Sequence, residues 1–261
     1  MTLSDKLLYN SRKKLALFIT AGFPSADSTV PLVLELANAG ADLIELGIPF
    51  SDPIADGPTI QLSSETALRN GVTLEKTFAM ARAIRQRSDV PLVLMGYANP
   101  VYAFGLSRFL DSCVDAGIDG TIVADLPLEE SEEYRRLAQE KGTATIFLAA
   151  PTTSRERLIQ LDRISTGFLY CVSITGVTGE RQSLAAQAET FLREARDAVK
   201  INPLLVGFGI ATPDDAKRVA AFSDGVIIGS ALIKILQNAK SNHRTDHAAK
   251  FVRSLREALN S

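Results

Sequence analysis

The sequence has 261 residues, of which 46% are apolar and 22% are charged, and its formal net charge is -2. This composition is that of an ordinary globular protein, and the length fits one large domain or two small ones. The scattered basic residues exclude the usual basic surface for nucleic acid, and no apolar run approaches the roughly 20 residues that span a bilayer. We therefore expect a cytoplasmic protein without nucleic-acid or membrane partners.

Short runs rich in Val, Ile, Leu and Phe alternate with amphipathic stretches along the whole chain, several of which end on a glycine that is typical of a helix C-terminus. The eight runs predicted as strands are Leu15–Thr20, Asp42–Leu46, Pro91–Gly96, Gly120–Ala124, Thr143–Ala149, Gly167–Val172, Leu204–Gly207 and Gly225–Ile228. No linker or shift of composition divides them.

This alternation predicts an α/β fold, a single (β/α)8 TIM barrel whose one domain spans residues 1–261. An additional N-terminal helix is expected near Leu3–Lys13, and a short extra helix after the eighth strand. The alternative is an open doubly wound sheet, which usually has a glycine fingerprint after its first strand. Here that strand is followed by TAGFPSAD, which lacks the fingerprint.

The second predicted strand carries a glutamate, Glu45, just before the loop GIPFSDPIADG. Side chains alternate along a strand, so Glu45 points into the barrel mouth if Ile44 and Leu46 face the helices. Burial there raises the pKa of a carboxyl group, which suits an acid/base catalyst; the alternative is a structural glutamate paired with a cation. Asp56 lies in a loop that can fold back over the same mouth, although Asp before Gly is also common turn chemistry.

Two glycine-rich segments follow the seventh and eighth strands. VGFGIATPDDA contains Gly207 and Gly209, and VIIGSALIK contains Gly229 and Ser230 at the start of a short helix. Loops in these two positions form the phosphate site of many barrels, where backbone N–H groups bind the anion. We therefore predict a phosphorylated small molecule as substrate. The segment SITGVTGERQS after the sixth strand is either a tolerated insertion or a lid, and its length favours a lid.

Other kinds of chemistry lack the residues they need. No predicted strand contains a lysine, so Schiff-base chemistry has no obvious nucleophile. The only histidines, His243 and His247, have a spacing that could hold a metal, but they lie in a polar segment before a final helix that Thr245 or Asp246 is expected to cap. We expect no metal site and no cofactor.

The motif ELGIPFSDPIADG closely resembles the signature of the tryptophan synthase α-subunit family. The other motifs that are similar to this family are FITAGFP, MGYANPVYAFG, IVADLPLEE, YCVSITGVTG, VGFGI and IIGSALI, in chain order. The resemblance implies a cofactor-independent lyase of tryptophan biosynthesis, which cleaves indole-3-glycerol phosphate to indole and D-glyceraldehyde 3-phosphate by a retro-aldol reaction. It also implies that indole passes to a pyridoxal-phosphate β-subunit in an α2β2 heterotetramer.

Carried over residue by residue, the resemblance implies that Glu45 is the general acid/base, that Asp56 is the second catalytic carboxylate and that Tyr170 lies beside them. The substrate-binding residues that it implies are Thr178 in the lid, Gly179, Gly207, Gly209, Gly229 and Ser230 around the phosphate, and Phe18, Tyr97, Ile122 and Phe208 around the indole ring. For these last four residues, plain core packing is the alternative.

The implied reaction needs carboxylates at both ends of one ring system. Asp56 would accept a hydrogen bond from the ring N–H, and Glu45 would handle two proton transfers at the other end. Asp52 fits neither role, and we predict that it contacts the partner. The other residues predicted on this partner-binding rim are Pro53, Asn99, Pro100, Glu129 and Glu130.

Two alternatives stay open at this point. Another phosphate-binding barrel, such as a sugar-phosphate epimerase or an indole-glycerol-phosphate synthase, would need histidine ligands or a lysine on its strands. A non-catalytic regulatory barrel of the same complex would keep the fold and the β-subunit partner without the chemistry. The presence of both Glu45 and Asp56 argues against it.

Overall fold

The computed structural model describes residues 1–172, 181–207 and 209–261. Eight strands form a closed barrel in the order β1 to β8, and all neighbours are parallel. The strands are β1 (Lys14–Thr20), β2 (Leu43–Gly47), β3 (Leu92–Gly96), β4 (Gly120–Val123), β5 (Ala144–Ala149), β6 (Leu169–Val172), β7 (Leu204–Gly207) and β8 (Gly225–Ile228). The predicted (β/α)8 barrel is confirmed.

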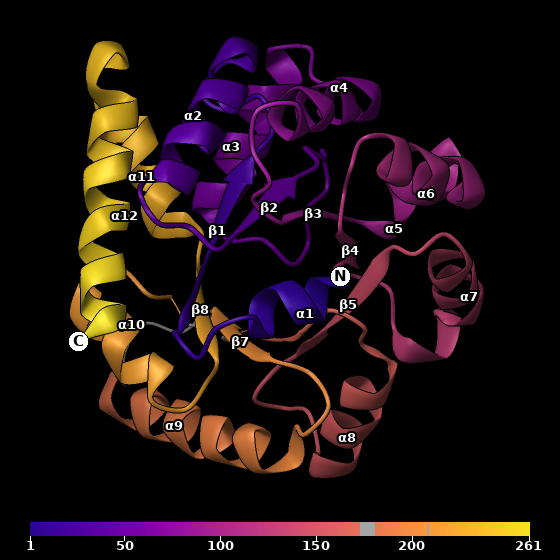
Figure 1. Cartoon of the computed structure of the whole chain (residues 1–261), viewed down its shortest axis with the longest axis vertical. Helices are drawn as coiled ribbons and strands as arrows, with labels where there is room; N and C mark the ends of the chain where they lie inside the picture. Colours follow the sequence, from indigo (N-terminus) through magenta and orange to yellow (C-terminus); the bar gives the residue numbers. More distant parts are fainter. Residues whose placement is uncertain (173–180, 208) are drawn as a thin grey trace.

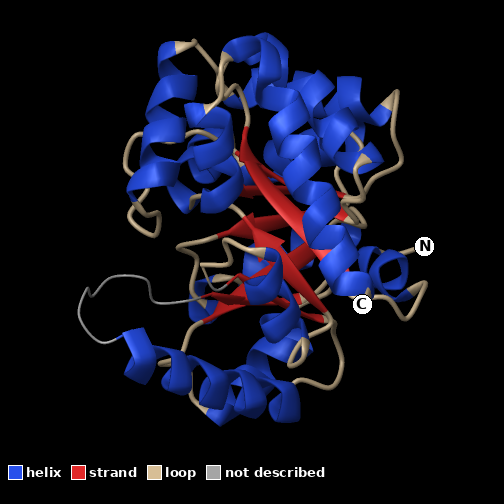
Figure 2. Ribbon diagram, turned by 90° about the vertical axis from the view of Figure 1, so that its left-hand side faces the viewer, coloured by secondary structure: helices blue, strands red, loops and turns tan. Residues whose placement is uncertain are grey.

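Helices surround the strands, which run through the middle of the molecule (Figure 2). The helices are α1 (Leu3–Leu8), α2 (Thr29–Asn38), α3 (Pro58–Arg69), α4 (Leu74–Arg85), α5 (Ala98–Phe104), α6 (Leu106–Asp115), α7 (Glu132–Glu140), α8 (Arg155–Ile164), α9 (Arg181–Ala198), α10 (Pro213–Ala220), α11 (Ser230–Asn238) and α12 (Arg244–Asn260). The described residues also form the short 3-10 turns η1 (Ala26–Ser28), η2 (Leu128–Glu130) and η3 (Ser241–His243). The extra helix predicted after the eighth strand is α11.

Alternation of side chains along the strands separates two cores. Ile44 and Leu46 of β2 face outward and pack in the large core shared with the helices. Leu43 faces inward and belongs to a smaller core inside the barrel, which also contains Leu3 and Leu7 of α1. The N-terminal helix therefore closes the amino end of the barrel, and it lies across the ring of strands in Figure 1. Glu45 has the parity of Leu43, so its side chain points inward as predicted.

The first strand begins one residue earlier than predicted, so one strand does contain a lysine. Lys14 lies at the amino end of β1, where its Nζ donates a hydrogen bond of 2.5 Å to Oδ1 of Asn10. Its side chain is buried, and this burial lowers the pKa of the ammonium group. Lys14 is thus far along the strand from the catalytic mouth, and the premise that no strand holds a lysine was wrong.

Two helix ends also differ from the predictions. The N-terminal helix ends at Leu8, well before Lys13. The final helix begins at Arg244, and no side chain caps it, so the predicted caps Thr245 and Asp246 were wrong. The turn η3 leads directly into this helix, and it therefore starts earlier than the capping pattern indicated. In the described ranges, no helix is long and apolar enough to cross a membrane.

Candidate active site

Glu45 is fully buried near the carboxyl end of β2, between Phe18 of β1 and Val93 of β3 in the strand register. Neither of its carboxyl oxygens has a hydrogen-bond partner among the described residues. Burial without such a partner raises the pKa of Glu45 to about 8. A structural glutamate would be paired with a cation, and the described part of the chain provides no such ion pair.

This arrangement is unfavourable for folding. Buried polar groups in folded proteins nearly always have a partner, and a charge without one costs several kcal/mol, which a raised pKa avoids by keeping the group neutral. A buried, unpartnered carboxyl at the catalytic end of a barrel is therefore a candidate for proton transfer near neutral pH.

Tyr170 on β6 lies near both predicted carboxylates. Burial raises the pKa of its phenol well above the usual value, and the charges of Glu45 and Asp56 raise it further. Gly207, at the end of β7, makes room for this ring, because a Cβ there would lie only 2.7 Å from the Tyr170 hydroxyl oxygen. The structure thus brings together the three residues that the sequence predicts as catalytic, and their roles stay predictions.

Asp56 lies in the loop between β2 and α3, which folds back toward the end of β3. The amide of the preceding residue, Ala55, donates a hydrogen bond of 3.2 Å to the hydroxyl of Tyr97. Burial raises the pKa of Asp56, and a side-chain hydrogen bond with Tyr97 lowers it by a smaller amount. The aspartate therefore does more than complete a turn, because its side chain contacts a second loop of the barrel mouth.

The residues predicted around an indole ring lie in different surroundings. Phe18 is 8% exposed, and its ring lies against Gly47, where a Cβ would be only 2.5 Å from Cζ of the ring. Tyr97 is also buried and packs against Phe50, with ring centroids 5.4 Å apart. Ile122 is packed in the core inside the barrel. Their contact with a substrate stays a prediction.

Four of the predicted phosphate residues lie at or just after the ends of β7 and β8. Gly209 has a positive φ of 57°, which favours glycine. Gly229 precedes α11, which begins at Ser230, and its carbonyl accepts the first helical hydrogen bond, from Ile233 at 3.1 Å. The N–H groups of the first turn have no acceptor within the helix, and such groups bind anions.

Three predicted site residues, Thr178, Gly179 and Phe208, lie outside the described residues. The predicted lid, Thr175 to Arg181, also lies outside the described residues up to its last residue, Arg181, where α9 begins.

Sequence reasoning missed two side chains of the barrel mouth. Met95 on β3 and Leu148 on β5 face inward, and they are partly exposed, unlike the fully buried residues deeper in the barrel. The same alternation that placed Glu45 inward would have identified both of them.

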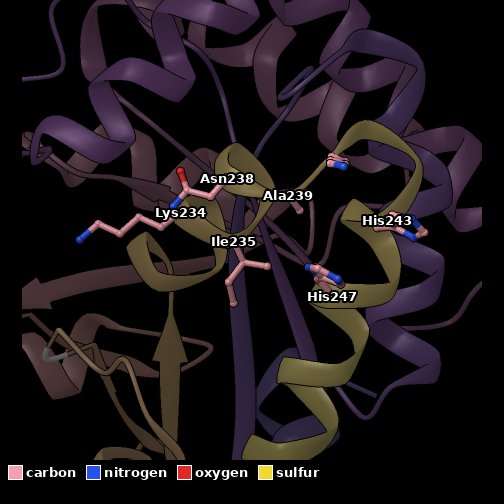
Figure 3. Close-up of a pocket in the computed structure, with 7 residues that line it drawn as sticks. Lys234, Ile235, Asn238, Ala239, His243 and His247 are labelled. Carbon is pink, nitrogen blue, oxygen red and sulfur yellow. The ribbon is translucent and has the colours of Figure 1, made fainter.

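Two cavities of the described residues lie away from these side chains. One, of about 460 Å³, lies between α11 and the start of α12 and includes His243 and His247, whose rings are stacked with centroids 6.2 Å apart (Figure 3). The described residues include no group of three or more His, Cys, Asp or Glu that could hold a metal. A larger cavity, of about 1000 Å³, lies at the amino end near Lys6 and Asp119. Perturbed carboxyl groups therefore locate the candidate active site better than cavity size.

The predicted partner-binding rim is partly occupied by contacts within the chain. Asp52 is exposed, and the neighbouring Ile54 is 82% exposed, which is unusual for a large apolar side chain. Glu129, in contrast, is held by Arg157 through two hydrogen bonds, one of them 2.7 Å long. This pairing lowers the pKa of Glu129 to about 2. Ile54 is a rim residue that the sequence reasoning missed.

Comparisons with known proteins give one consistent result. The sequence model of the family described as "Tryptophan synthase alpha chain" matches residues 5–260. The tryptophan synthase alpha chain of Geobacter sulfurreducens is 48% identical over 254 residues, covering 97% of this chain and 96% of the relative. That of Geotalea uraniireducens is 46% identical over 253 residues, covering 97% and 94%.

Solved structures agree. The crystal structure of the tryptophan synthase alpha chain from Legionella pneumophila superposes with a TM-score of 0.86 at 38% identity, covering 100% of this chain and 98% of that one. A structure of Mycobacterium tuberculosis tryptophan synthase superposes with a TM-score of 0.88 at 33% identity, covering 99% and 97%.

Proposed function

The chain belongs to the tryptophan synthase alpha chain family, and on this premise we propose how its own side chains carry out the reaction. It is a carbon–carbon lyase that cleaves indole-3-glycerol phosphate to indole and glyceraldehyde 3-phosphate in tryptophan biosynthesis. The observation that carries the proposed mechanism is the fully buried Glu45, whose carboxyl has no described partner and a pKa raised to about 8.

Glu45 acts first as an acid and then as a base. With a pKa near 8, its carboxyl is mostly protonated at neutral pH, and it gives its proton to C3 of the indole ring. The bond between C3 and the glycerol carbon then breaks, and its electron pair neutralises the ring. The carboxylate takes the proton of the adjacent hydroxyl, which becomes the aldehyde, and Glu45 is protonated again.

Asp56 stabilises the charge that develops at the other end of the ring. Its carboxylate accepts a hydrogen bond from the ring N–H, and this bond strengthens when protonation at C3 makes the ring cationic. The hydrogen bond with Tyr97 supports this role, because it lowers the pKa of Asp56 and so favours the ionised form. Tyr170 would lie beside the reacting atoms, because its phenol is close enough to Glu45 and Asp56 for both carboxyl groups to raise its pKa.

Substrate binding divides into an anionic and an apolar part. Backbone N–H groups near the ends of β7 and β8 would hold the phosphate, mainly those in the first turn of α11. The described residues in this role are Gly207, Gly209, Gly229 and Ser230, and the role implied for Gly179 lies outside the described residues. Among the described residues, Phe18, Tyr97 and Ile122 are the proposed walls for the indole ring; the roles implied for Phe208 and Thr178 lie outside the described residues.

The proposed partner is a tryptophan synthase β-subunit in an α2β2 heterotetramer. The alignment of this chain onto Mycobacterium tuberculosis tryptophan synthase supports a partner of that kind. Asp52 and Ile54 would contact it, because both are exposed on the loop that carries Asp56. We also propose that residues 1–261 act as one domain, in the cytoplasm.

An assay of indole release tests the proposal. The purified chain should release indole from indole-3-glycerol phosphate without added metal or cofactor, and faster with a β-subunit present. Release that is absent from the isolated chain and from the complex, with a normal stimulation of the β-subunit, would instead identify a regulatory barrel.

A further inference from the structure

The hydroxyl of Tyr97 lies between a rigid part of the barrel and the loop that carries Asp56. Tyr97 directly follows β3 and precedes α5, and the next amide, of Ala98, donates a 2.7 Å hydrogen bond to Asp125 after β4. The side chain is only 4% exposed, and its ring packs against Phe50. Two strand ends and an aromatic contact therefore fix this hydroxyl in place.

The hydroxyl uses both of its hydrogen-bonding capacities on that loop. Its oxygen accepts the 3.2 Å bond from the Ala55 amide, which leaves its proton to be donated to the Asp56 carboxylate. Burial and the nearby carboxylates of Asp56 and Asp125 raise the pKa of the phenol, so it stays protonated and remains a donor. A phenylalanine would keep the ring packing and lose both bonds.

We propose that Tyr97 is a positioning residue for Asp56, whose hydroxyl fixes the carboxylate at the ring nitrogen before substrate arrives. This inference rests on the proposed function of Asp56 and adds to the apolar role predicted for Tyr97. A carboxylate that is held in place does not have to be ordered during the reaction, so the bond acts on the transition state more than on binding.

The Tyr97→Phe variant tests the proposal, with Tyr102→Phe as the matched control. Tyr102 lies on α5, the helix that Tyr97 precedes, and its side chain is 44% exposed. We expect Tyr97→Phe to lower kcat about 10- to 100-fold, as for a lost hydrogen bond to a charged group, with a smaller change in KM. Tyr102→Phe should stay within about two-fold of the parent chain.

A pH profile separates positioning from packing. Among the described residues, the charged and titratable groups near Asp56 are Tyr97 and Tyr170, and Glu45 lies near Tyr170. Asp56 must be ionised, so activity falls as pH drops through its pKa, and losing the Tyr97 bond raises that pKa. The acidic limb should therefore move to higher pH in Tyr97→Phe. In an Asp56→Asn background, Tyr97→Phe should cost less than about three-fold, because the group it positions is already gone.

Hydrogen exchange gives a readout that needs no substrate. The Ala55 amide should exchange faster in Tyr97→Phe than in the parent chain and should be unchanged in Tyr102→Phe. Tyr97→Phe activity within about two-fold of the parent, with an unmoved acidic limb and unchanged Ala55 exchange, would overturn the proposal. A parent chain that releases no indole would refute the proposed function, while the exchange result would still decide whether Tyr97 holds the loop.

Discussion

The two ends of the barrel treat their carboxylates in opposite ways. At the amino end, Asp42, Asp119 and Asp224 each precede an even-numbered strand, and each accepts a hydrogen bond of 2.8 to 2.9 Å from the backbone of the strand before it. Each also pairs with a cation: Asp119, for example, is bound by Lys6 at 2.6 Å and by Arg85 at 2.8 Å.

At the carboxyl end, Glu45 has no described partner, and burial raises the pKa values of Glu45 and Asp56. Carboxylates therefore pair with cations at one end of the barrel, whereas at the other end they are buried, and we propose that they serve proton transfer and charge stabilisation there. Substitutions at the amino end should therefore change stability more than activity, and substitutions at the carboxyl end should do the reverse.

The largest effect is expected for Glu45→Gln. The amide keeps the shape of the side chain and loses the transferable proton, so cleavage should fall by about 10³-fold or more while substrate binding is largely kept. Rates of indole release and binding of substrate by calorimetry measure the two effects. Glu65→Gln, on the exposed face of α3, is the matched control. A loss of binding as large as the loss of activity would contradict this role.

Asp56→Asn should have the next largest effect. A neutral amide cannot stabilise a cationic ring, so we expect kcat/KM to fall by about 10²-fold. Steady-state kinetics of the purified variant measure the fall. A value within a few-fold of the parent chain would mean that Asp56 is only part of a turn.

The opposite pattern is expected at the amino end. Asp119→Asn removes the partner of Lys6 and Arg85, which are both partly exposed, so it should lower the free energy of unfolding by about 1–2 kcal/mol. Urea unfolding measures this loss, and Asp111→Asn, in an exposed pair with Lys141, should cost less. At urea concentrations below the unfolding transition, the activity of Asp119→Asn should stay near that of the parent chain. A large loss of kcat would contradict the proposed difference between the two ends.

The smallest effect is expected at the partner-binding rim. Asp52→Ala should lower the β-stimulated rate by about three- to ten-fold, and it should change the basal rate much less, because a partner that binds there favours the closed loop. Both rates are measured on the same preparation. An equal fall in the two would place Asp52 in the site chemistry, and no fall in either would remove it from the interface.

The fold was predictable because βα alternation is a strong local signal, and the eight strands were located to within two residues. The inward direction of Glu45 followed from the period of two, with Ile44 and Leu46 packed outward as expected. Strand ends were less certain: Lys14 joined β1 because its neighbour in the register is Gly225, which only the closed barrel brings beside it.

The site was less predictable where loops meet. The family resemblance implied that Tyr97 lines an apolar pocket. It did not indicate that the Tyr97 hydroxyl accepts a hydrogen bond from the amide of Ala55, 42 residues earlier. Such a bond depends on the paths of two loops, and no local pattern encodes it. The pairing of Glu129 with Arg157 is of the same kind. The sequence also did not indicate that Ile54 is exposed, because large apolar side chains are buried at most positions.

Glu45 should be protonated near neutral pH because no described residue partners its buried carboxyl group. Infrared difference spectroscopy of the parent chain and Glu45→Gln isolates the carbonyl band of this carboxylic acid, and a pH titration gives its midpoint directly. The predicted midpoint is about 8, well above the ordinary value of 4.5. A midpoint near 4.5 would contradict the account, because Glu45 would then be ionised at neutral pH and could not deliver the first proton.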